Sequence, residues 1–150
     1  MAAEQNKAVV RRYVEEVLDQ ANVAVLDELM AEDAINRTSH RLSSSTAREG
    51  VSQSAGVLRA AFPDLHISVE DQFGEGDRVA TRLRLSGTHQ GSFRGAPPTG
   101  KHVIWTAIRI DRLADGKIAE YWEETDRVGL FQQLGGVPAQ EQPASPTPAA

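Results

Sequence analysis

Hydrophobic side chains recur at helical spacing in the N-terminal part of the chain. In the first segment they fall every three or four residues, opposite a charged face: Val9, Val10, Tyr13, Val14, Val17 and Leu18. A second, shorter stripe consists of Val23, Leu26, Leu29 and Met30. The spacing predicts a third helix from about Arg48 to Phe62, which Pro63 ends.

From Leu65 onward the period becomes two, which is typical of strands with one buried face. Asp115-Gly116 predicts a tight hairpin turn between the last two strands. The predicted strands are 65–69, 79–85, about 102–112 and about 118–125. A short extended stretch is also expected to begin at Ala34, and a polar loop over residues 43–46. Asp126 can cap a last helical turn over 127–134.

Helices followed by an antiparallel meander indicate an α+β fold rather than alternating βαβ units. The helices must bury their apolar stripes, so we expect a curved antiparallel sheet wrapped around the N-terminal helices, a cone with an internal pocket. Residues 1–136 are predicted to form this single domain. Residues 137–150 are rich in Pro and Ala and are predicted to be a disordered tail.

Composition narrows the function classes. The 150 residues include no cysteine, which excludes disulfides, thiolate nucleophiles and cysteine-based metal sites. The formal net charge of −5 argues against nucleic acid as a partner. No apolar run reaches the roughly 20 residues of a membrane span, and the N-terminus has no apolar signal core. We therefore expect a cytoplasmic protein without a membrane partner.

The predicted strand over 102–112 is apolar on both faces. Val103, Trp105 and Ala107 share one face, with Arg109 next along it, and three isoleucines share the other: Ile104, Ile108 and Ile110. Such a strand needs cover on both sides. We expect the second cover to be another copy of the chain, in a homodimer through the outer face of the sheet.

The last predicted strand carries most of the candidate carboxylates. Alternation places Tyr121 and Glu123 on one face, and Glu120, Trp122 and Glu124 on the other. A carboxylate inside an apolar cone can transfer protons near neutral pH. For Glu123 this role and that of a solvated surface group remain equally open, whereas Glu120 and Glu124 are expected to be surface groups.

Other polar and aromatic residues are candidates for ligand contacts. Asn36 can hold a carbonyl or enolate oxygen, and His40 can carry a proton or simply be exposed. Trp105 and Tyr121 can form a stacking wall. The histidines lack metal-ligand spacing, so no metal is expected.

Three motifs resemble a known family. They are Gly-Thr-His-Gln-Gly-Ser-Phe-Arg-Gly-Ala-Pro-Pro-Thr-Gly at 87–100, Ala-Phe-Pro-Asp-Leu-His at 61–66, and the segment 115–135 with its Asp-Gly-Lys-Ile and Gln-Leu-Gly steps. Together they are similar to the SnoaL-like polyketide cyclases, or ester cyclases, of the nuclear-transport-factor-2-like superfamily. That superfamily also contains ketosteroid isomerase and scytalone dehydratase.

The resemblance implies a cone with an apolar pocket, a dimer, and catalysis without a cofactor. A carboxylate on the last strand would take a proton from an activated carbon of an apolar, carbonyl-containing small molecule, and the enolate would close a ring by an aldol step. Glu123 stands where the family has an aspartate. Asn36 matches a pocket asparagine, but Tyr121, Ala107 and Arg109 depart from the family's residues.

Asp126 corresponds to an acid that is widespread in these sequences, and it is the second catalytic candidate. The predicted substrate contacts are Asn36, His40, Trp105, Arg109, Tyr121 and Val17. Epoxide hydrolysis, isomerisation or dehydration on the same cone, and ligand binding without catalysis, remain alternatives.

Overall fold

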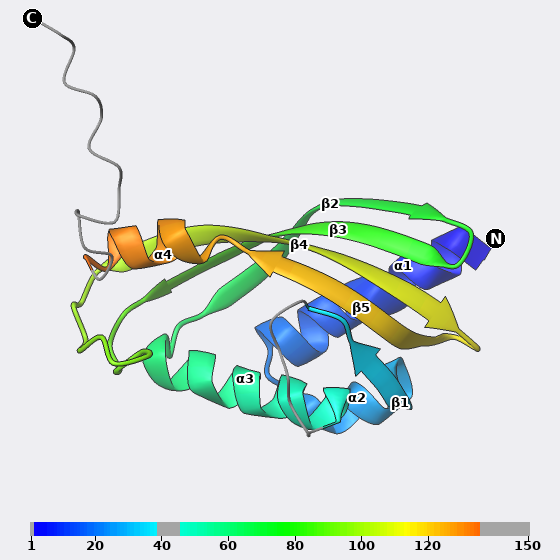
Figure 1. The fold of residues 1–150 in the computed structure, drawn as a ribbon, viewed down its shortest axis with the longest axis horizontal. Coiled ribbons are helices and arrows are strands. Elements are labelled where there is room, and N and C mark those ends of the chain that lie inside the picture. The colour runs from blue at the N-terminus through cyan, green and yellow to red at the C-terminus, as the bar shows by residue number, and fades with distance from the viewer. Residues whose placement is uncertain (1, 39–45, 136–150) are drawn as a thin grey trace, which may run out of the picture.

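The computed structural model describes residues 2–38 and 46–135. Helices cover one side of a strongly curved sheet (Figure 1). The helical elements are α1 (Ala2–Arg12), the π-helical η1 (Tyr13–Asp19), the 3-10 turn η2 (Val23–Val25), α2 (Leu26–Leu29), α3 (Ala47–Ala61) and α4 (Arg127–Gln133). His40, residues 43–45 of the predicted polar loop, and the predicted tail lie outside the described residues.

The N-terminal helix buries the predicted stripe. Val10, Val14 and Val17 are fully buried, together with Tyr13, because α1 and η1 pack against the concave face of β2 (His66–Glu75) and β3 (Arg78–Thr88). The helix widens to π-helical geometry from Tyr13 to Asp19. At the end of this segment, the side chain of Arg59 donates hydrogen bonds to the backbone carbonyls of Leu18 and Asp19.

Local sequence signals fix the ends of α3. Thr46 accepts a hydrogen bond from the Glu49 backbone N–H at 3.2 Å, and the Glu49 side chain accepts one from the Thr46 N–H at 3.3 Å. This reciprocal capping box satisfies two backbone donors that the helix cannot. Pro63 follows the C-terminus, as the sequence predicts.

The sheet is mixed rather than purely antiparallel. Its order is β1-β5-β4-β3-β2, with β1 at Met30–Asn36, β4 at His102–Ala114 and β5 at Lys117–Thr125. The expectation of an all-antiparallel sheet was wrong at one edge, because β1 pairs with β5 in parallel. Met30 belongs to this strand and not to the preceding helix, because its backbone is extended (φ −126°, ψ 133°) and it pairs with Ile118.

Further strand boundaries differ from the prediction, and β2 continues to Glu75, beyond the predicted strand over 65–69. β1 runs from Met30 to Asn36, so it begins before Ala34, at which the extended stretch was expected to begin. β3 continues to Thr88, beyond the predicted strand over 79–85, because its pairing with β4 persists as far as Thr88 opposite His102. The Asp115-Gly116 hairpin turn is confirmed, with positive φ at both residues (52° and 77°).

The two faces of β4 have different environments, as its alternation predicts. Residues with odd numbers from Val103 to Leu113 are buried in the concave side. Ile104, Ile108 and Ile110 lie on the convex side and are 41%, 54% and 40% exposed in the single chain. The chain alone therefore leaves an apolar stripe along the middle of its outer sheet face.

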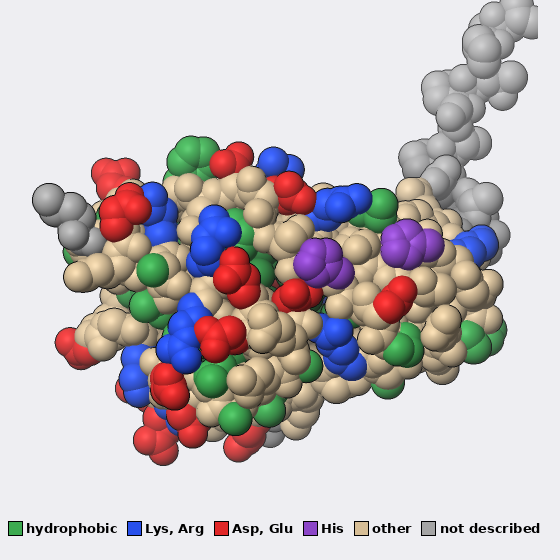
Figure 2. All heavy atoms as spheres, turned by 180° about the vertical axis from the view of Figure 1, so that it is seen from behind, with side chains coloured by type: hydrophobic (Ala, Val, Ile, Leu, Met, Phe, Trp, Pro, Cys, Tyr) green, Lys and Arg blue, Asp and Glu red, His purple; other side chains and the backbone are tan. Residues whose placement is uncertain are grey.

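The surface carries charges of both signs. Figure 2 shows the side of the molecule that is turned away from the viewer in Figure 1, and acidic and basic side chains are interspersed over it. Charged side chains within α1 and η1 form ion pairs, such as Lys7 with Glu4 and Arg12 with Glu16. None of the helices described is both long and apolar enough to cross a membrane.

Candidate active site

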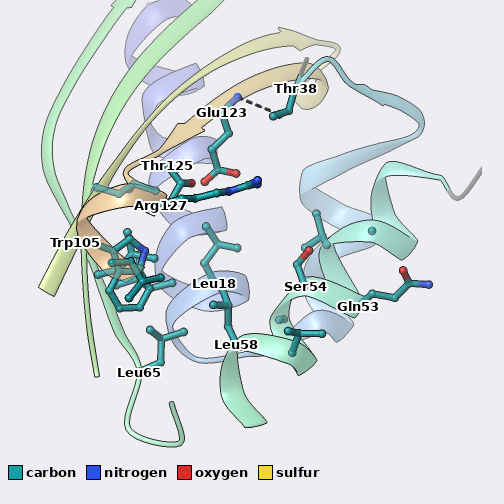
Figure 3. Close-up of a pocket in the computed structure, with 18 of the residues that line it drawn as sticks. Leu18, Thr38, Gln53, Ser54, Leu58, Leu65, Trp105, Glu123, Thr125 and Arg127 are labelled. Carbon is teal, nitrogen blue, oxygen red and sulfur yellow. Dashed lines mark hydrogen bonds between the residues drawn. The ribbon is translucent and has the colours of Figure 1, made fainter. Parts of the chain in front are cut away.

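A cavity of about 320 Å³ lies between the concave face of the sheet and the helices η1, α3 and α4 (Figure 3). Its walls are largely apolar, with leucines from η1, α3, β3 and the residue before β2, and aromatic rings from β4 and the loop before it. Polar lining residues gather at the β5 side, namely Asn36, Thr38, Tyr121, Glu123, Thr125 and Arg127, while Gln53 and Ser54 of α3 and Arg94 of the loop after β3 line other parts of the cavity. The structure thus combines a largely apolar cavity with a polar wall at β5.

Glu123 lies on this polar wall. Tyr121 and Glu123 share one face of β5, as the sequence predicts, and the structure places this face, together with Thr125, on the concave side. The Glu123 side chain is 31% exposed, and its backbone N–H donates a hydrogen bond of 3.2 Å to the Thr38 hydroxyl (Figure 3). Its carboxylate therefore reaches both the cavity and solvent, while its backbone is fixed to the end of β1.

Arg109 lies opposite Glu123 on β4, but it is buried behind the cavity. Its Nε and Nη2 donate hydrogen bonds of 2.9 and 2.6 Å to the carboxylate of Asp111, two residues along the same strand. Its guanidinium also lies 4.6 Å from the ring centroids of both Tyr13 and Tyr121. Its Nη1 is 4.0 Å from Oε2 of Glu123.

Burial affects the pKa values of Arg109 and of Tyr13 beside it. Desolvation by itself would lower the pKa of the Arg109 guanidinium, but the attraction of Asp111 and the other nearby groups holds it well above its ordinary value. Burial raises the pKa of the Tyr13 phenol above its ordinary range. A permanent cation therefore lies below the polar wall, and it is not among the residues that line the cavity. The sequence predicts Arg109 as a direct substrate contact, but the geometry supports that contact only through Glu123.

The end of β1 supplies the amide that the sequence predicts. Asn36 lines the cavity, and its Oδ1 accepts a hydrogen bond of 2.9 Å from the backbone N–H of Thr38. Its side-chain NH₂ is then oriented by this bond. Parallel pairing of Asn36 with Tyr121 brings the amide to the same wall as Glu123.

The remaining predicted residues divide into two groups. Trp105 and Tyr121 line the cavity, whereas Val17 is fully buried in the core and is not part of the described lining. Asp126 is also not part of that lining, because its carboxylate accepts a 2.9 Å hydrogen bond from the Gly129 N–H and caps α4.

The other acids of β5 do not face the cavity. Glu124 is exposed, as expected. The Glu120 side chain is only 12% exposed and lies between Arg112 and Arg37, whose hydrogen bonds lower its pKa.

Arg127 is a site residue that the sequence alone did not indicate. It is the first residue of α4, and helical side chains tilt toward the helix N-terminus, so its side chain is directed back toward the end of β5. It lines the cavity with Glu123 and Thr125. The sequence did carry one hint of a role for Arg127. The helix dipole makes a cation unfavourable in the first turn of a helix, and an arginine nevertheless occupies that position.

Comparison with known proteins identifies the family of this chain. The family model for the SnoaL-like polyketide cyclases matches residues 8–134. The chain belongs to the SnoaL-like polyketide cyclase family. It is 30% identical to the nogalonic acid methyl ester cyclase of Streptomyces nogalater over 111 residues, which are 73% of this chain and 83% of that protein.

Two further relatives share shorter segments. The aklanonic acid methyl ester cyclases DnrD of Streptomyces peucetius and DauD of Streptomyces sp. (strain C5) are 33% and 34% identical over 79 residues. These matches span 54% and 49% of the two relatives and 52% of this chain. The chain thus matches about half the length of each of them.

Solved structures share the fold. AclR of Streptomyces galilaeus, which is described as a hydroxylase, superposes with a TM-score of 0.79 at 29% identity, covering 91% of this chain and 88% of AclR. Wild-type IdmH of Streptomyces antibioticus gives 0.75 at 33% identity, covering 87% and 99%. The predicted family and α+β cone are therefore confirmed, with the one parallel strand as the difference.

Proposed function

We propose that this SnoaL-like chain is a cofactor-independent ester cyclase that closes a ring by an intramolecular aldol reaction, with Glu123 as its acid and base. The observation that carries the proposal is the place of Glu123, which is the carboxylate that lines this largely apolar cavity in the described part of the chain. A base in such a place acts on a substrate from which water is largely displaced.

The chemistry needs one proton carrier. The Glu123 carboxylate takes a proton from a carbon that lies between carbonyl groups, so a C–H bond breaks and an O–H bond forms on Glu123. The enolate carbon then attacks a carbonyl carbon of the same molecule and forms the new C–C bond. The resulting alkoxide takes the proton back from Glu123, and no electrons leave the substrate. This balance requires no redox partner.

The residues around Glu123 support this role. Thr38 fixes the backbone at Glu123, and the buried Arg109 attracts its carboxylate from behind. Arg109 is itself held by Asp111, so we assign it to positioning and not to substrate contact. Asn36 and Tyr121 lie on the same wall, where they can donate hydrogen bonds to carbonyl oxygens of the substrate.

The related proteins suggest a test substrate. Nogalonic acid methyl ester is the compound in the name of the relative whose match covers 83% of its length, so it is the first choice, followed by aklanonic acid methyl ester. We expect this chain to cyclise an aromatic polyketide ester of that class. Cyclisation leaves the mass unchanged, whereas epoxide opening adds the mass of one water and dehydration removes it, so mass spectrometry separates these reactions.

Replacement of the carboxylate tests the assignment. We expect Glu123→Gln to lower kcat by roughly 10²–10⁴-fold, because the amide cannot accept the carbon-bound proton. Glu124→Gln is the matched control, since it makes the same change one residue along β5 on the solvent side. Equal activity of both variants and the wild-type protein, with unchanged circular dichroism, would overturn the proposal.

A further inference from the structure

We propose that Arg127 stabilises the oxyanion that forms on the substrate when Glu123 removes its proton. This inference rests on the proposed function, and it adds to it a second group that contacts the reacting atoms. It also assigns a chemical class to the ligand at this end of the cavity, namely a molecule that carries an ionisable oxygen.

The position of Arg127 follows from the junction between β5 and α4. Glu123 and Thr125 occupy the last inward-facing positions of β5, and Arg127 begins the helix two residues later. The Asp126 cap fixes the start of α4, so the Arg127 side chain is held in the first turn. Figure 3 shows the side chains of Glu123 and Arg127 extending from this junction toward the cavity.

The other cations near the cavity have different environments. Arg94 lies on an exposed loop with its guanidinium 5.6 Å from the ring centroid of Phe93. Arg109 is buried behind the wall and paired with Asp111. Arg127 is half-buried on the wall itself. Among the described residues that line the cavity, it is the cation that shares the polar wall with the proposed base.

Removal of the proton by Glu123 creates a negative charge on the substrate that Arg127 can stabilise. When Glu123 becomes neutral, the negative charge moves to an enolate oxygen of the substrate. An arginine stays charged at any working pH and presents several N–H donors in one plane. Leu130 and Phe131 of α4 also line the cavity, and such apolar surroundings strengthen an attraction between cation and oxyanion.

Alizarin (1,2-dihydroxyanthraquinone) is a suitable probe, because its phenol changes colour on ionisation and its ring system is planar. The protein is titrated with alizarin at several pH values, and the pKa of the bound phenol is read from its absorbance. We expect wild-type protein to bind the anion more tightly than the neutral form, which lowers the pKa of the bound phenol. Arg127→Gln should raise that pKa by at least about one pH unit, a tenfold change in the ionisation constant.

The control is Arg11→Gln, which removes the same charge from an exposed site on α1 that is not part of the described cavity lining. It should leave the pKa of bound alizarin unchanged. An equal pKa in wild-type protein and Arg127→Gln would overturn the inference, as would failure of the wild-type protein to bind the alizarin anion. This readout does not use turnover, so it stands or falls separately from the loss of cyclisation expected for Glu123→Gln.

Discussion

Glu123 and Arg109 lie opposite each other on the neighbouring strands β5 and β4, but the Glu123 side chain is partly exposed whereas that of Arg109 is buried. The alternation of β5 was enough to predict that Glu123 and Tyr121 share one face of the strand, but it left open whether Glu123 faces the cavity or solvent. The sequence did not predict that Arg109 is buried, because this depends on Asp111 and on two tyrosines, one of them about a hundred positions away along the chain. Long-range contacts of this kind have no local signature.

The Tyr13 phenol makes the stability of this buried cluster depend on pH. Its pKa is raised in the folded protein, so the folded state keeps the proton after unfolded chains lose theirs at about pH 10. The contribution of Tyr13 is complete below that pH and declines above it, by up to about 1.4 kcal/mol per pH unit.

The comparison variant is Tyr13→Phe, which keeps the ring that contacts Arg109. We expect the unfolding free energy of the wild-type protein, measured in urea between pH 8 and about pH 11, to fall more steeply above pH 10 than that of Tyr13→Phe. Parallel profiles for the two proteins would contradict the burial of the phenol.

At the scale of elements, the helices and the four antiparallel strands could be predicted, because each carries a clear period or cap. The exception is β1, whose sequence Met-Ala-Glu-Asp-Ala-Ile-Asn does not alternate. Only its parallel pairing with β5 makes it a strand, and its register is irregular between Met30 and Ile35. That pairing is what brings Asn36 and Thr38 to the polar wall.

The cap of α4 separates two roles for Asp126. Its carboxylate accepts the Gly129 N–H, so we expect Asp126→Ala to lower the unfolding free energy by about 1 kcal/mol. Asp126→Asn keeps a capping oxygen and should retain both stability and cyclisation. If Asp126→Asn loses activity as completely as Glu123→Gln does, Asp126 is a catalytic residue and not only a cap.

At the scale of the whole molecule, the outer sheet face carries three parallel rows. The isoleucines of β4 form the middle row. On one side lies a basic row on β3, made of Arg78, Arg82 and Arg84, and on the other lie the acids Glu120 and Glu124 of β5. A two-fold axis along β4, within the interface, would place the basic row of one copy over the acidic row of the other.

We therefore expect two copies to associate through this face, as the two apolar faces of the strand already suggested. Ile108→Glu places a charge in the middle row and should shift the protein from dimer to monomer in light scattering after size exclusion. Gln53→Glu adds the same charge on α3, away from the sheet, and should leave the dimer intact. A monomeric wild-type protein at micromolar concentration would contradict this expectation.

The central claim is that Glu123 removes a carbon-bound proton, and solvent exchange measures that step directly. In D₂O, NMR follows the acidic C–H of nogalonic acid methyl ester with wild-type protein, Glu123→Gln and Glu124→Gln. We predict that wild-type protein and Glu124→Gln speed the loss of this signal, through exchange or ring closure, while Glu123→Gln leaves it at the buffer rate. Loss of the signal at the wild-type rate with Glu123→Gln would contradict the account.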